Sequence, residues 1–333
     1  MNLVVGGAGF LGRAVARLLI DQGEAVRVLD LRPSPDGVES HTGDLRDGEL
    51  LKRALDGVTT VHHCASAFSQ NPASRSRLEA VNVAGAQRLL DAARSAGVTG
   101  FAYTSSVDVL SDGTPISGAP PSWEPVARPL GVYAQTKAVA ETLILGSDDP
   151  AGMRTCAIRP AGIWGPHDRL RMPQVLDAAR QGMFVRIGDG SSLYSHVYVD
   201  NVAWAQILAA RALPAGVVGG NAYAVTDSEP ENFHAFLLPL VQHALGEAPV
   251  KTLPRPIALP VAWATEAAYT LFGRWLSGEP DLTRYTVGAL SRDLWFTYER
   301  AKRDFGYEPL VSLDEARART CAWLDTLANP EAA

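Results

Sequence analysis

A glycine-rich turn between an apolar strand and a periodic helix constrains the fold of this chain most. The stretch LVVGGAGFLGRAVARLLIDQG places three glycines where the helix would begin. Glycine permits a tight turn, a close approach of the backbone to a pyrophosphate, and close packing of helix on strand. The next apolar run, VRVLD, ends in Asp30, an acid placed to bind ribose hydroxyls. A purely structural turn is the alternative, but this context predicts dinucleotide binding. The turn residues expected to contact the dinucleotide are Gly6, Gly9, Phe10, Leu11 and Gly12.

Charged residues after the second and third predicted strands bear on which dinucleotide binds. Asp30 would repel the 2′-phosphate of NADP, so the sequence favours NAD; Arg32 would pair with that phosphate, which keeps NADP as an alternative. In GDLRD, Asp44 is placed to accept a hydrogen bond from the adenine amino group, with Leu45 covering the ring. The alternative for Asp44 is a side chain that caps the next helix.

The first half of the chain alternates β-branched runs with helical patterns. This alternation is typical of βαβ units, so we expect an α/β fold with a doubly wound parallel sheet covered on both faces. The expected strands are Leu3–Val5, Ala25–Leu29, Thr59–His63, Gly100–Thr104 and Thr155–Arg159. The expected helices are Leu11–Asp21, Glu49–Leu55, Leu78–Ala96 and Tyr133–Leu145.

The remaining segments predict a loop and a smaller second region. Residues 111–131 are rich in Pro, Gly and Ser and are read as a functional loop without regular structure. After Pro160 the alternation becomes irregular, which predicts a mostly C-terminal substrate-binding region. The expected division is a dinucleotide-binding domain at 1–160 plus a returning segment near 190–228, and a substrate-binding region at 161–189 and 229–333. Helices are expected at Asn232–Leu245, Ile257–Leu276 and Leu282–Leu290, with a closing amphipathic helix in LDEARARTCAWLDTL.

Composition excludes several classes of protein. The net charge of −6 over 333 residues gives no basic footprint for nucleic acid. The three cysteines are scattered without metal-ligand spacing, so we expect no metal site and a reducing, cytoplasmic location. The long apolar stretch Ile257–Leu276 contains Pro260 and Glu266, so we expect no membrane-spanning helix.

The stretch GVYAQTKAVAE places Tyr133 and Lys137 four residues apart on one face of a helix. The plain reading is a solvated surface on which Lys137 pairs with Glu141. The alternative is a proton-transfer site. A free tyrosine has a pKa of about 10, and a nearby ammonium and an oxidised nicotinamide would lower it. Ser106, which ends FAYTSS, would then hydrogen-bond the reacting oxygen.

Taken together, GGAGFLG, TSS and YAQTK resemble the extended short-chain dehydrogenase/reductase family, and the similarity covers nearly the whole chain. Within it, YTSSVDV, TCAIRPAGIWGPHD, YVDNVAWA, NAYAVTDSEP and AKRDFGYEPLVSLDEA are similar to the 3β-hydroxysteroid dehydrogenase/isomerase group. The resemblance implies an NAD-dependent oxidoreductase with Tyr133 as general acid/base, Lys137 as its pKa-lowering partner and ribose ligand, and Ser106 as the substrate-orienting donor.

The same resemblance implies further contacts to the cofactor. Ser105, the competing choice for the catalytic serine, is placed among the cofactor-binding residues, and Ala65 would line the cofactor groove. Pro160 and Ile163 would lie by the nicotinamide. Relatives often dimerise through two long helices, which here would be Leu78–Ala96 and Tyr133–Leu145, so a homodimer is expected by analogy.

The substrate is expected to be hydrophobic, because the second half of the chain is rich in apolar residues. We expect a secondary alcohol and its ketone, as in 3β-hydroxysteroids; an isomerisation step has no second acid in the sequence to support it. Positions expected to face the substrate are Asp108, Trp164 and Ser195, with His167, Tyr194 and His196 as further candidates. Trp164 and Tyr194 fit equally well as core or rim aromatic residues.

Three alternative functions stay open at this stage. A 2-alkyl-3-oxo acid reductase would need an arginine or lysine in its pocket for the carboxylate; Arg159, Arg169, Arg171 and Arg186 lie in that half of the chain. A nucleotide-sugar dehydratase would carry an Asp-Glu pair where this chain has Val107 and Asp108. A non-catalytic NAD sensor would lack the Tyr–Lys pair.

Overall fold

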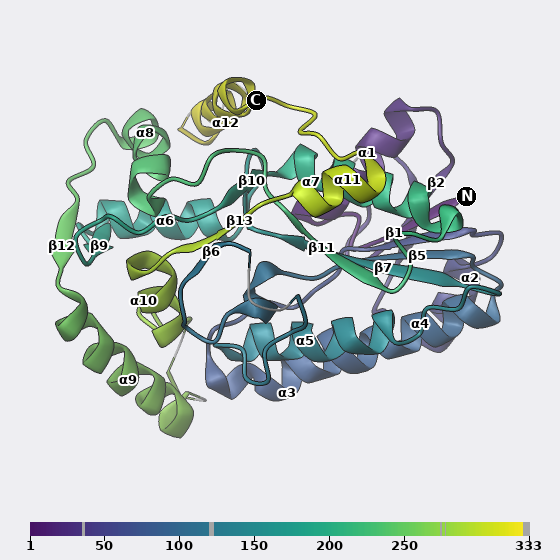
Figure 1. Cartoon of the computed structure of the whole chain (residues 1–333), viewed down its shortest axis with the longest axis horizontal. Coiled ribbons are helices and arrows are strands. Elements are labelled where there is room, and N and C mark those ends of the chain that lie inside the picture. Colours follow the sequence, from purple (N-terminus) through teal and green to yellow (C-terminus); the bar gives the residue numbers. More distant parts are fainter. Residues whose placement is uncertain (35–36, 120–122, 274, 277, 329–333) are drawn as a thin grey trace.

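The chain folds around a seven-stranded, fully parallel sheet with the strand order β11-β7-β5-β4-β1-β2-β3 (Figure 1). This computed structural model describes residues 1–34, 37–119, 123–273, 275–276 and 278–328. The strands of the sheet are β1 (Asn2–Val5), β2 (Val26–Asp30), β3 (Glu39–Thr42), β4 (Thr60–His63), β5 (Gly100–Thr104), β7 (Arg154–Pro160) and β11 (Asn221–Val225). The predicted doubly wound α/β fold is confirmed.

Two hydrophobic layers hold the sheet between helices. Alternation along β1 sends Leu3 and Val5 into one layer and Val4 into the other, which is the period of a strand buried on both faces. Helices α2, α4 and α5 cover the first face, and α1 and α7 cover the second (Figure 1). Their bounds are α1 (Phe10–Asp21), α2 (Gly48–Ala54), α4 (Ala86–Ser95), α5 (Val132–Leu145) and α7 (Val199–Ala212).

The helix predicted at Leu78–Ala96 is longer and irregular. It begins as α3 (Arg75–Leu78), continues as a π-helical segment (Glu79–Gly85) and ends as α4. The wider π turn lets buried Asn82 reach the loop after β4: its amide donates to the carbonyl of Ala67 at 2.9 Å and to Thr136 Oγ1 at 3.0 Å. Asn82 thus ties this loop to α5.

Three short parallel strand pairs lie outside the main sheet. They are β6 (Ile116–Gly118) with β13 (Leu294–Phe296), β8 (Gly162–Trp164) with β10 (His196–Tyr198), and β9 (Val185–Ile187) with β12 (Lys251–Leu253). The first pair corrects the prediction that 111–131 lacks regular structure, because a strand of the C-terminal part of the chain supplies the backbone partners that the loop does not have locally. Residues 120–122 of that loop lie outside the described residues.

The remaining helices gather mainly at one end of the sheet and along its second face (Figure 1). They are α6 (Arg171–Arg180), α8 (Phe233–Leu245), α9 (Arg255–Phe272), α10 (Arg284–Ser291), α11 (Glu299–Phe305) and α12 (Leu313–Ala328). Single 3₁₀ turns lie at Pro72–Ser74, Val107–Leu110 and Leu213–Ala215. The domain boundaries given above stay predictions.

Helix α9 begins earlier and ends earlier than the predicted helix Ile257–Leu276. It follows Pro254 and stops at Phe272, before Gly273. Among the described residues, no helix combines the length and the apolar character that crossing a membrane requires. Several large apolar side chains of α9 are nevertheless exposed, among them Ile257, Val261 and Trp263.

Candidate active site

The glycine turn packs against the loop that follows β4. Gly6 has a φ of +83°, and a Cβ atom there would lie 2.6 Å from the backbone nitrogen of Ala65. At Gly12 a Cβ atom would lie 2.1 Å from the carbonyl oxygen of Gly6, so only glycine lets α1 begin this close to the turn. Ala65 therefore lies beside the turn, where its predicted role in the cofactor groove requires it.

Asp30 ends β2 next to the same turn. Its carboxylate accepts hydrogen bonds from the backbone nitrogen of Ala8 at 3.1 Å and from that of Arg32 at 3.1 Å. The acid thus faces the turn from the neighbouring strand, as in dinucleotide sites in which it binds ribose hydroxyls. The contacts of Asp30 and Arg32 with a cofactor stay predictions.

The turn after β3 contains two acids, Asp44 and Asp47, which bind different partners. Asp44 pairs with the guanidinium of Arg46 at 2.6 Å, and these hydrogen bonds hold the pKa of Asp44 below its usual value. Asp47 caps α2 by accepting from the backbone nitrogens of Glu49 and Leu50, so the capping role considered for Asp44 belongs to Asp47.

Leu45 lies in the same turn and is buried. It packs so closely on the π-helical segment that a Cβ atom at Gly85 would lie 2.4 Å from Leu45 Cδ1. Its predicted adenine contact stays a prediction.

The plain reading of the Tyr–Lys helix, a surface pair between Lys137 and Glu141, is wrong. Glu141 is completely buried and forms a bidentate ion pair with Arg159 on β7, at 2.8 and 2.5 Å. Arg159 also donates to the carbonyl of Trp123 at 2.6 Å. This buried pair ties α5 to the sheet and supports the structural role expected for Arg159.

Lys137 lies inside the protein, with 2% of its surface exposed. Its ammonium group donates to the carbonyl of Thr104 at 2.5 Å and lies 4.2 Å from the centroid of the Tyr103 ring. Burial lowers the pKa of Lys137 from 10.5 to about 7, although the negative charge of Glu141 opposes the change. A lysine with this pKa changes its protonation state near neutral pH.

Tyr133 is at the start of the same helix, with its ring 4.9 Å from that of Phe68. Burial raises the pKa of the Tyr133 phenol above its usual value, and the negative charge of Asp108 adds to this rise, against a hydrogen bond with Ser66 that lowers it. Desolvation therefore outweighs the favourable interactions of Tyr133 in this structure. The predicted lowering of its pKa involves an oxidised nicotinamide and stays a prediction.

Ser106 and Asp108 form a buried pair at the end of β5. The Ser106 hydroxyl donates to Asp108 Oδ2 at 3.0 Å, and the hydroxyl of Tyr285 on α10 donates to Asp108 Oδ1 at 2.8 Å. Burial raises the pKa of Asp108, although both hydrogen bonds and the charge of Arg171 oppose this. Sequence reasoning missed Tyr285, since no local pattern marks a residue that lies 177 positions from its partner.

A second cluster continues from Tyr285 toward β8 and β10. Tyr194 belongs to this cluster, and its ring centroid lies 5.7 Å from the guanidinium carbon of Arg171. Arg171 also lies 3.1 Å from His196 Nδ1 and donates to the carbonyl of Ile163 at 3.4 Å. Tyr194 and His196, considered from the sequence to face the substrate, thus lie beside a cation.

Two predicted substrate contacts are not available in this structure. Trp164 is completely buried, with its ring against those of Tyr198 and Phe236, so it belongs to the core rather than to a pocket wall. Ser195 is also buried, and its hydroxyl accepts from the backbone nitrogen of Phe296 at 3.0 Å. That bond joins β10 to β13. Close packing, rather than substrate contact, accounts for both residues.

The groups around the turn fit a bound dinucleotide. Because the glycines carry no side chain, a pyrophosphate can approach the backbone N–H groups at the beginning of α1. Asp30 supplies an acceptor on the next strand. Ser105 adds a buried hydroxyl that has no hydrogen-bond partner among the described residues. Pro160 ends β7 and Ile163 lies on β8 close to this end of the sheet, so both stay candidates for contact with the nicotinamide.

Comparison with known proteins identifies relatives over nearly the whole chain. A model of the 3-beta hydroxysteroid dehydrogenase/isomerase family matches residues 3–255. A sterol-4-alpha-carboxylate 3-dehydrogenase, decarboxylating, of Mus musculus is 35% identical, covering 95% of this chain and 89% of that protein. A 3 beta-hydroxysteroid dehydrogenase/Delta 5-->4-isomerase of Mycobacterium tuberculosis is 35% identical, with 94% and 87% covered. A 2-alkyl-3-oxoalkanoate reductase of Stenotrophomonas maltophilia is 35% identical, with 95% and 97% covered.

The solved structures agree with this assignment. A short-chain dehydrogenase/reductase superfamily protein from Agrobacterium tumefaciens, crystallised with bound NAD, has a TM-score of 0.73 and 25% identity to this chain. The match covers 100% of this chain and 99% of that one. The fold is thus that of an extended short-chain dehydrogenase/reductase.

Proposed function

Because the chain belongs to the 3-beta hydroxysteroid dehydrogenase/isomerase family, we propose that it interconverts a secondary alcohol and a ketone on a hydrophobic, steroid-like substrate. The protein is an NAD-dependent dehydrogenase that acts on CH–OH groups, as its relatives' names indicate. One observation carries the finer proposal: Tyr133 and Lys137 share a face of α5, with Lys137 buried and Tyr133 partly exposed, near the Ser106–Asp108 pair.

Each side chain of this group has a task in the proposed reaction. In the oxidative direction, the deprotonated form of Tyr133, the phenolate, takes the proton of the substrate hydroxyl, and Ser106 Oγ donates a hydrogen bond to the same oxygen. Lys137, which titrates near neutral pH, supplies a positive charge that stabilises the tyrosinate when it is protonated. Bound NAD, held by the glycine turn and Asp30, would accept the hydride from the carbinol carbon. In the reductive direction, Tyr133 returns its proton to the forming alkoxide.

The apolar character of the substrate rests on Phe68 beside Tyr133 and on the exposed face of α9. Phe68 packs against its ring, and α9, the helix after β12, carries exposed apolar side chains such as Ile257 and Trp263. A hydrophobic skeleton would remove such surface from water at about 25 cal/mol per Å². We infer a sterol-like or long-chain substrate from these contacts.

The experiment is an absorbance assay in the reduced-nicotinamide band, with NAD and then NADP. The substrate panel contains hydroxysteroids, long-chain 3-hydroxy acids and simple secondary alcohols. Turnover of a hydrophobic alcohol with NAD is the expected result. Binding of NAD without turnover of any panel member would instead favour a sensor.

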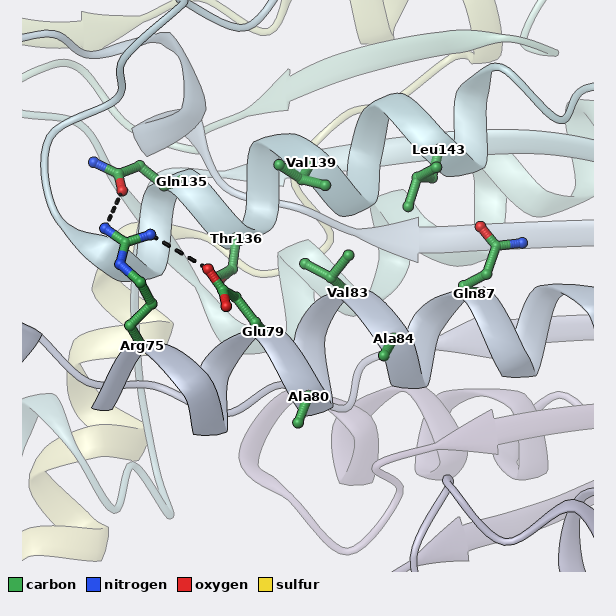
Figure 2. Close-up of a pocket in the computed structure, with 10 residues that line it drawn as sticks. All are labelled: Arg75, Glu79, Ala80, Val83, Ala84, Gln87, Gln135, Thr136, Val139 and Leu143. Atoms are coloured by element: carbon green, nitrogen blue, oxygen red, sulfur yellow. Dashed lines mark hydrogen bonds and ion pairs between the residues drawn. The ribbon is translucent and has the colours of Figure 1, made fainter. Parts of the chain in front are cut away.

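We also propose that the protein is a homodimer. The outer faces of α5 and of the α3–α4 helix line a shallow groove (Figure 2). Its walls are Arg75, Glu79, Ala80, Val83, Ala84, Gln87, Gln135, Thr136, Val139 and Leu143. Val139 is 50% exposed and Leu143 37%, and both lie on α5, so their apolar side chains are left in contact with water on this face.

Sedimentation of wild type and of Val139→Arg tests the dimer. We expect wild type to sediment as a dimer and the variant as a monomer, with Leu310→Arg, an exposed apolar position elsewhere, as the control. A dimer that survives Val139→Arg unchanged would exclude this face.

A further inference from the structure

The hydroxyl of Ser106 makes two hydrogen bonds to one residue, Asp108. Ser106 Oγ accepts from the backbone nitrogen of Asp108 at 3.2 Å, and it lies 3.0 Å from the carboxyl oxygen Oδ2 of the same residue. Both residues are buried, with 9% and 8% of their surfaces exposed. A hydroxyl has one proton to give and two lone pairs that accept. The two contacts with Asp108 therefore leave Ser106 one further hydrogen bond.

The charge of Asp108 decides what that remaining hydrogen bond can be. If the carboxyl group is ionised, it can only accept, so the single proton of Ser106 points at Oδ2. Ser106 is then left with a lone pair and no proton. The oxygen of a ketone or an alkoxide also has no proton to give. In this arrangement Ser106 cannot donate to the substrate oxygen, which is its task in the proposed reaction.

A neutral Asp108 reverses the direction of this hydrogen bond without moving an atom. The distance of 3.0 Å between Ser106 Oγ and Asp108 Oδ2 suits a donor on either side. When Oδ2 carries the proton, it donates to Ser106 Oγ, whose second lone pair already accepts from the backbone nitrogen of Asp108. Both lone pairs of the serine are then occupied. Its own proton is free for the substrate oxygen.

Tyr285 determines which oxygen of the carboxyl group carries the proton. Its hydroxyl, on α10, donates to Asp108 Oδ1 at 2.8 Å. Oδ1 is therefore the accepting, carbonyl-like oxygen of a neutral acid, and the proton lies on Oδ2, the oxygen that faces Ser106. A residue 177 positions along the chain thus sets the direction of the hydrogen bonds at the end of β5.

The surroundings of Asp108 are mostly uncharged. Burial raises the pKa of its carboxyl group, against its two hydroxyl donors and the positive charge of Arg171 on α6. The other titratable groups that act on it are phenols of α5, α10 and the segment before β10, namely Tyr133, Tyr285 and Tyr194. Burial raises the pKa of each phenol as well, so all three are almost wholly neutral between about pH 5 and pH 8.

We propose that Asp108 is a positioning residue: held by Tyr285 as a neutral carboxylic acid, it donates to Ser106 Oγ and directs the serine proton to the substrate oxygen. Asp108 then acts through Ser106 and does not itself contact the substrate. This inference rests on the proposed function and adds two residues, Asp108 and Tyr285, to the group that aligns the reacting oxygen.

The kinetic test compares Asp108→Asn with Asp108→Leu, using NAD and the best substrate of the panel. The asparagine amide always donates, and Tyr285 turns its carbonyl oxygen away from Ser106, so Asp108→Asn should keep kcat within about threefold of wild type. Asp108→Leu should lower kcat by about tenfold or more. Asp112→Asn, an exposed acid of the following loop that accepts from Thr114, is the control and should keep wild-type kcat.

The same substitutions in a Ser106→Ala protein show whether Asp108 acts through the serine. Asp108→Leu should cause no further loss of kcat there, because the hydroxyl that it directs is gone. Tyr285→Phe should lower kcat about threefold or more when Ser106 is present and have no effect when it is absent. An Asp108→Asn protein as slow as Asp108→Leu, or losses of equal size with and without Ser106, would overturn the proposal.

Urea unfolding of wild type and Asp108→Asn between about pH 5 and pH 8 needs no turnover. In the unfolded chain Asp108 ionises above its ordinary pKa of 3.8, whereas a neutral Asp108 in the folded protein keeps its proton. Wild type should therefore lose stability relative to Asp108→Asn as pH rises. The ratio of their unfolding constants should increase by up to about tenfold per pH unit until the folded carboxyl group ionises. Asp112→Asn should show no such trend, because its carboxyl group is exposed.

The two measurements separate this inference from the proposed reaction. A ratio that stays constant over this pH range would mean an ionised Asp108 and would overturn the inference, even if alcohols are turned over normally. A rising ratio in a protein that turns over no member of the panel would support the directed serine proton and reject the proposed reaction.

Discussion

Replacing Lys137 by methionine is expected to stabilise the folded protein near neutral pH while abolishing turnover. The lysine is buried, and burial lowers its pKa from 10.5 to about 7. At about 1.4 kcal/mol per pKa unit, this lowering corresponds to a cost of roughly 5 kcal/mol for folding with a protonated lysine. Methionine removes that cost and fills similar volume, but it leaves the carbonyl of Thr104 without its donor, a loss of about 1–3 kcal/mol. The net gain expected for the variant is roughly 2–4 kcal/mol.

The gain in the free energy of unfolding of Lys137→Met over wild type depends on pH. Below the folded pKa of about 7, both states are protonated and wild type carries the full cost. Between about 7 and 10.5 the unfolded state of wild type binds more protons than the folded state, so wild-type stability rises with pH. The advantage of Lys137→Met should therefore shrink by about 1.4 kcal/mol per pH unit, disappear roughly 1.5–3 units above the folded pKa, and reverse at the alkaline end of this range.

Urea unfolding at several values between about pH 6 and pH 10 measures this dependence. Lys52→Met is the control, because Lys52 is exposed and bound only to Glu49 on the same helix, and it should show no alkaline loss of advantage. A Lys137→Met protein that is less stable than wild type by the same amount at every pH would refute the burial argument. Retained turnover would refute the catalytic one.

Three other predictions follow from neighbouring contacts. Asp30→Ala should weaken NAD binding by about tenfold and improve NADP binding, because the acid that repels a 2′-phosphate is gone; titration of both cofactors measures this ratio. Glu141→Ala should lower the free energy of unfolding by about 3–5 kcal/mol, since it leaves Arg159 buried and unpaired, and a change below about 1 kcal/mol would contradict the buried pair. Alcohol oxidation should accelerate with rising pH, because the raised pKa of Tyr133 keeps its phenol protonated near neutrality and only a growing phenolate fraction reacts. Ketone reduction, which uses the protonated phenol, should change little over the same range. A flat profile of alcohol oxidation would exclude Tyr133 as the titrating group.

Local sequence patterns predicted most of the sheet because each strand and helix carries its own signal. The glycine turn, the apolar run before it and the acid that ends β2 lie within 30 residues, and the structure brings them together. The Tyr133–Lys137 pair was visible for the same reason, because a four-residue spacing on a helix fixes which side chains share a face.

Properties that depend on distant parts of the chain were not predictable in this way. The direction of the pKa shift of Tyr133 depends on burial, which α5 alone does not determine. Tyr285 reaches Asp108 only because α10 folds back over β5. A tryptophan at position 164 is equally compatible with the core and with a pocket wall, so the sequence did not distinguish the two. The rings of Tyr198 and Phe236, which pack against it, place it in the core.

The most direct test of the central claim is the rate of NAD reduction by Tyr133→Phe with the best substrate of the panel. Removing one hydroxyl should reduce turnover by about a hundredfold or more while the affinity for NAD stays unchanged. Tyr298→Phe, at the start of α11, is the control and should keep wild-type activity. A Tyr133→Phe protein with full activity would contradict the claim that this tyrosine transfers the proton.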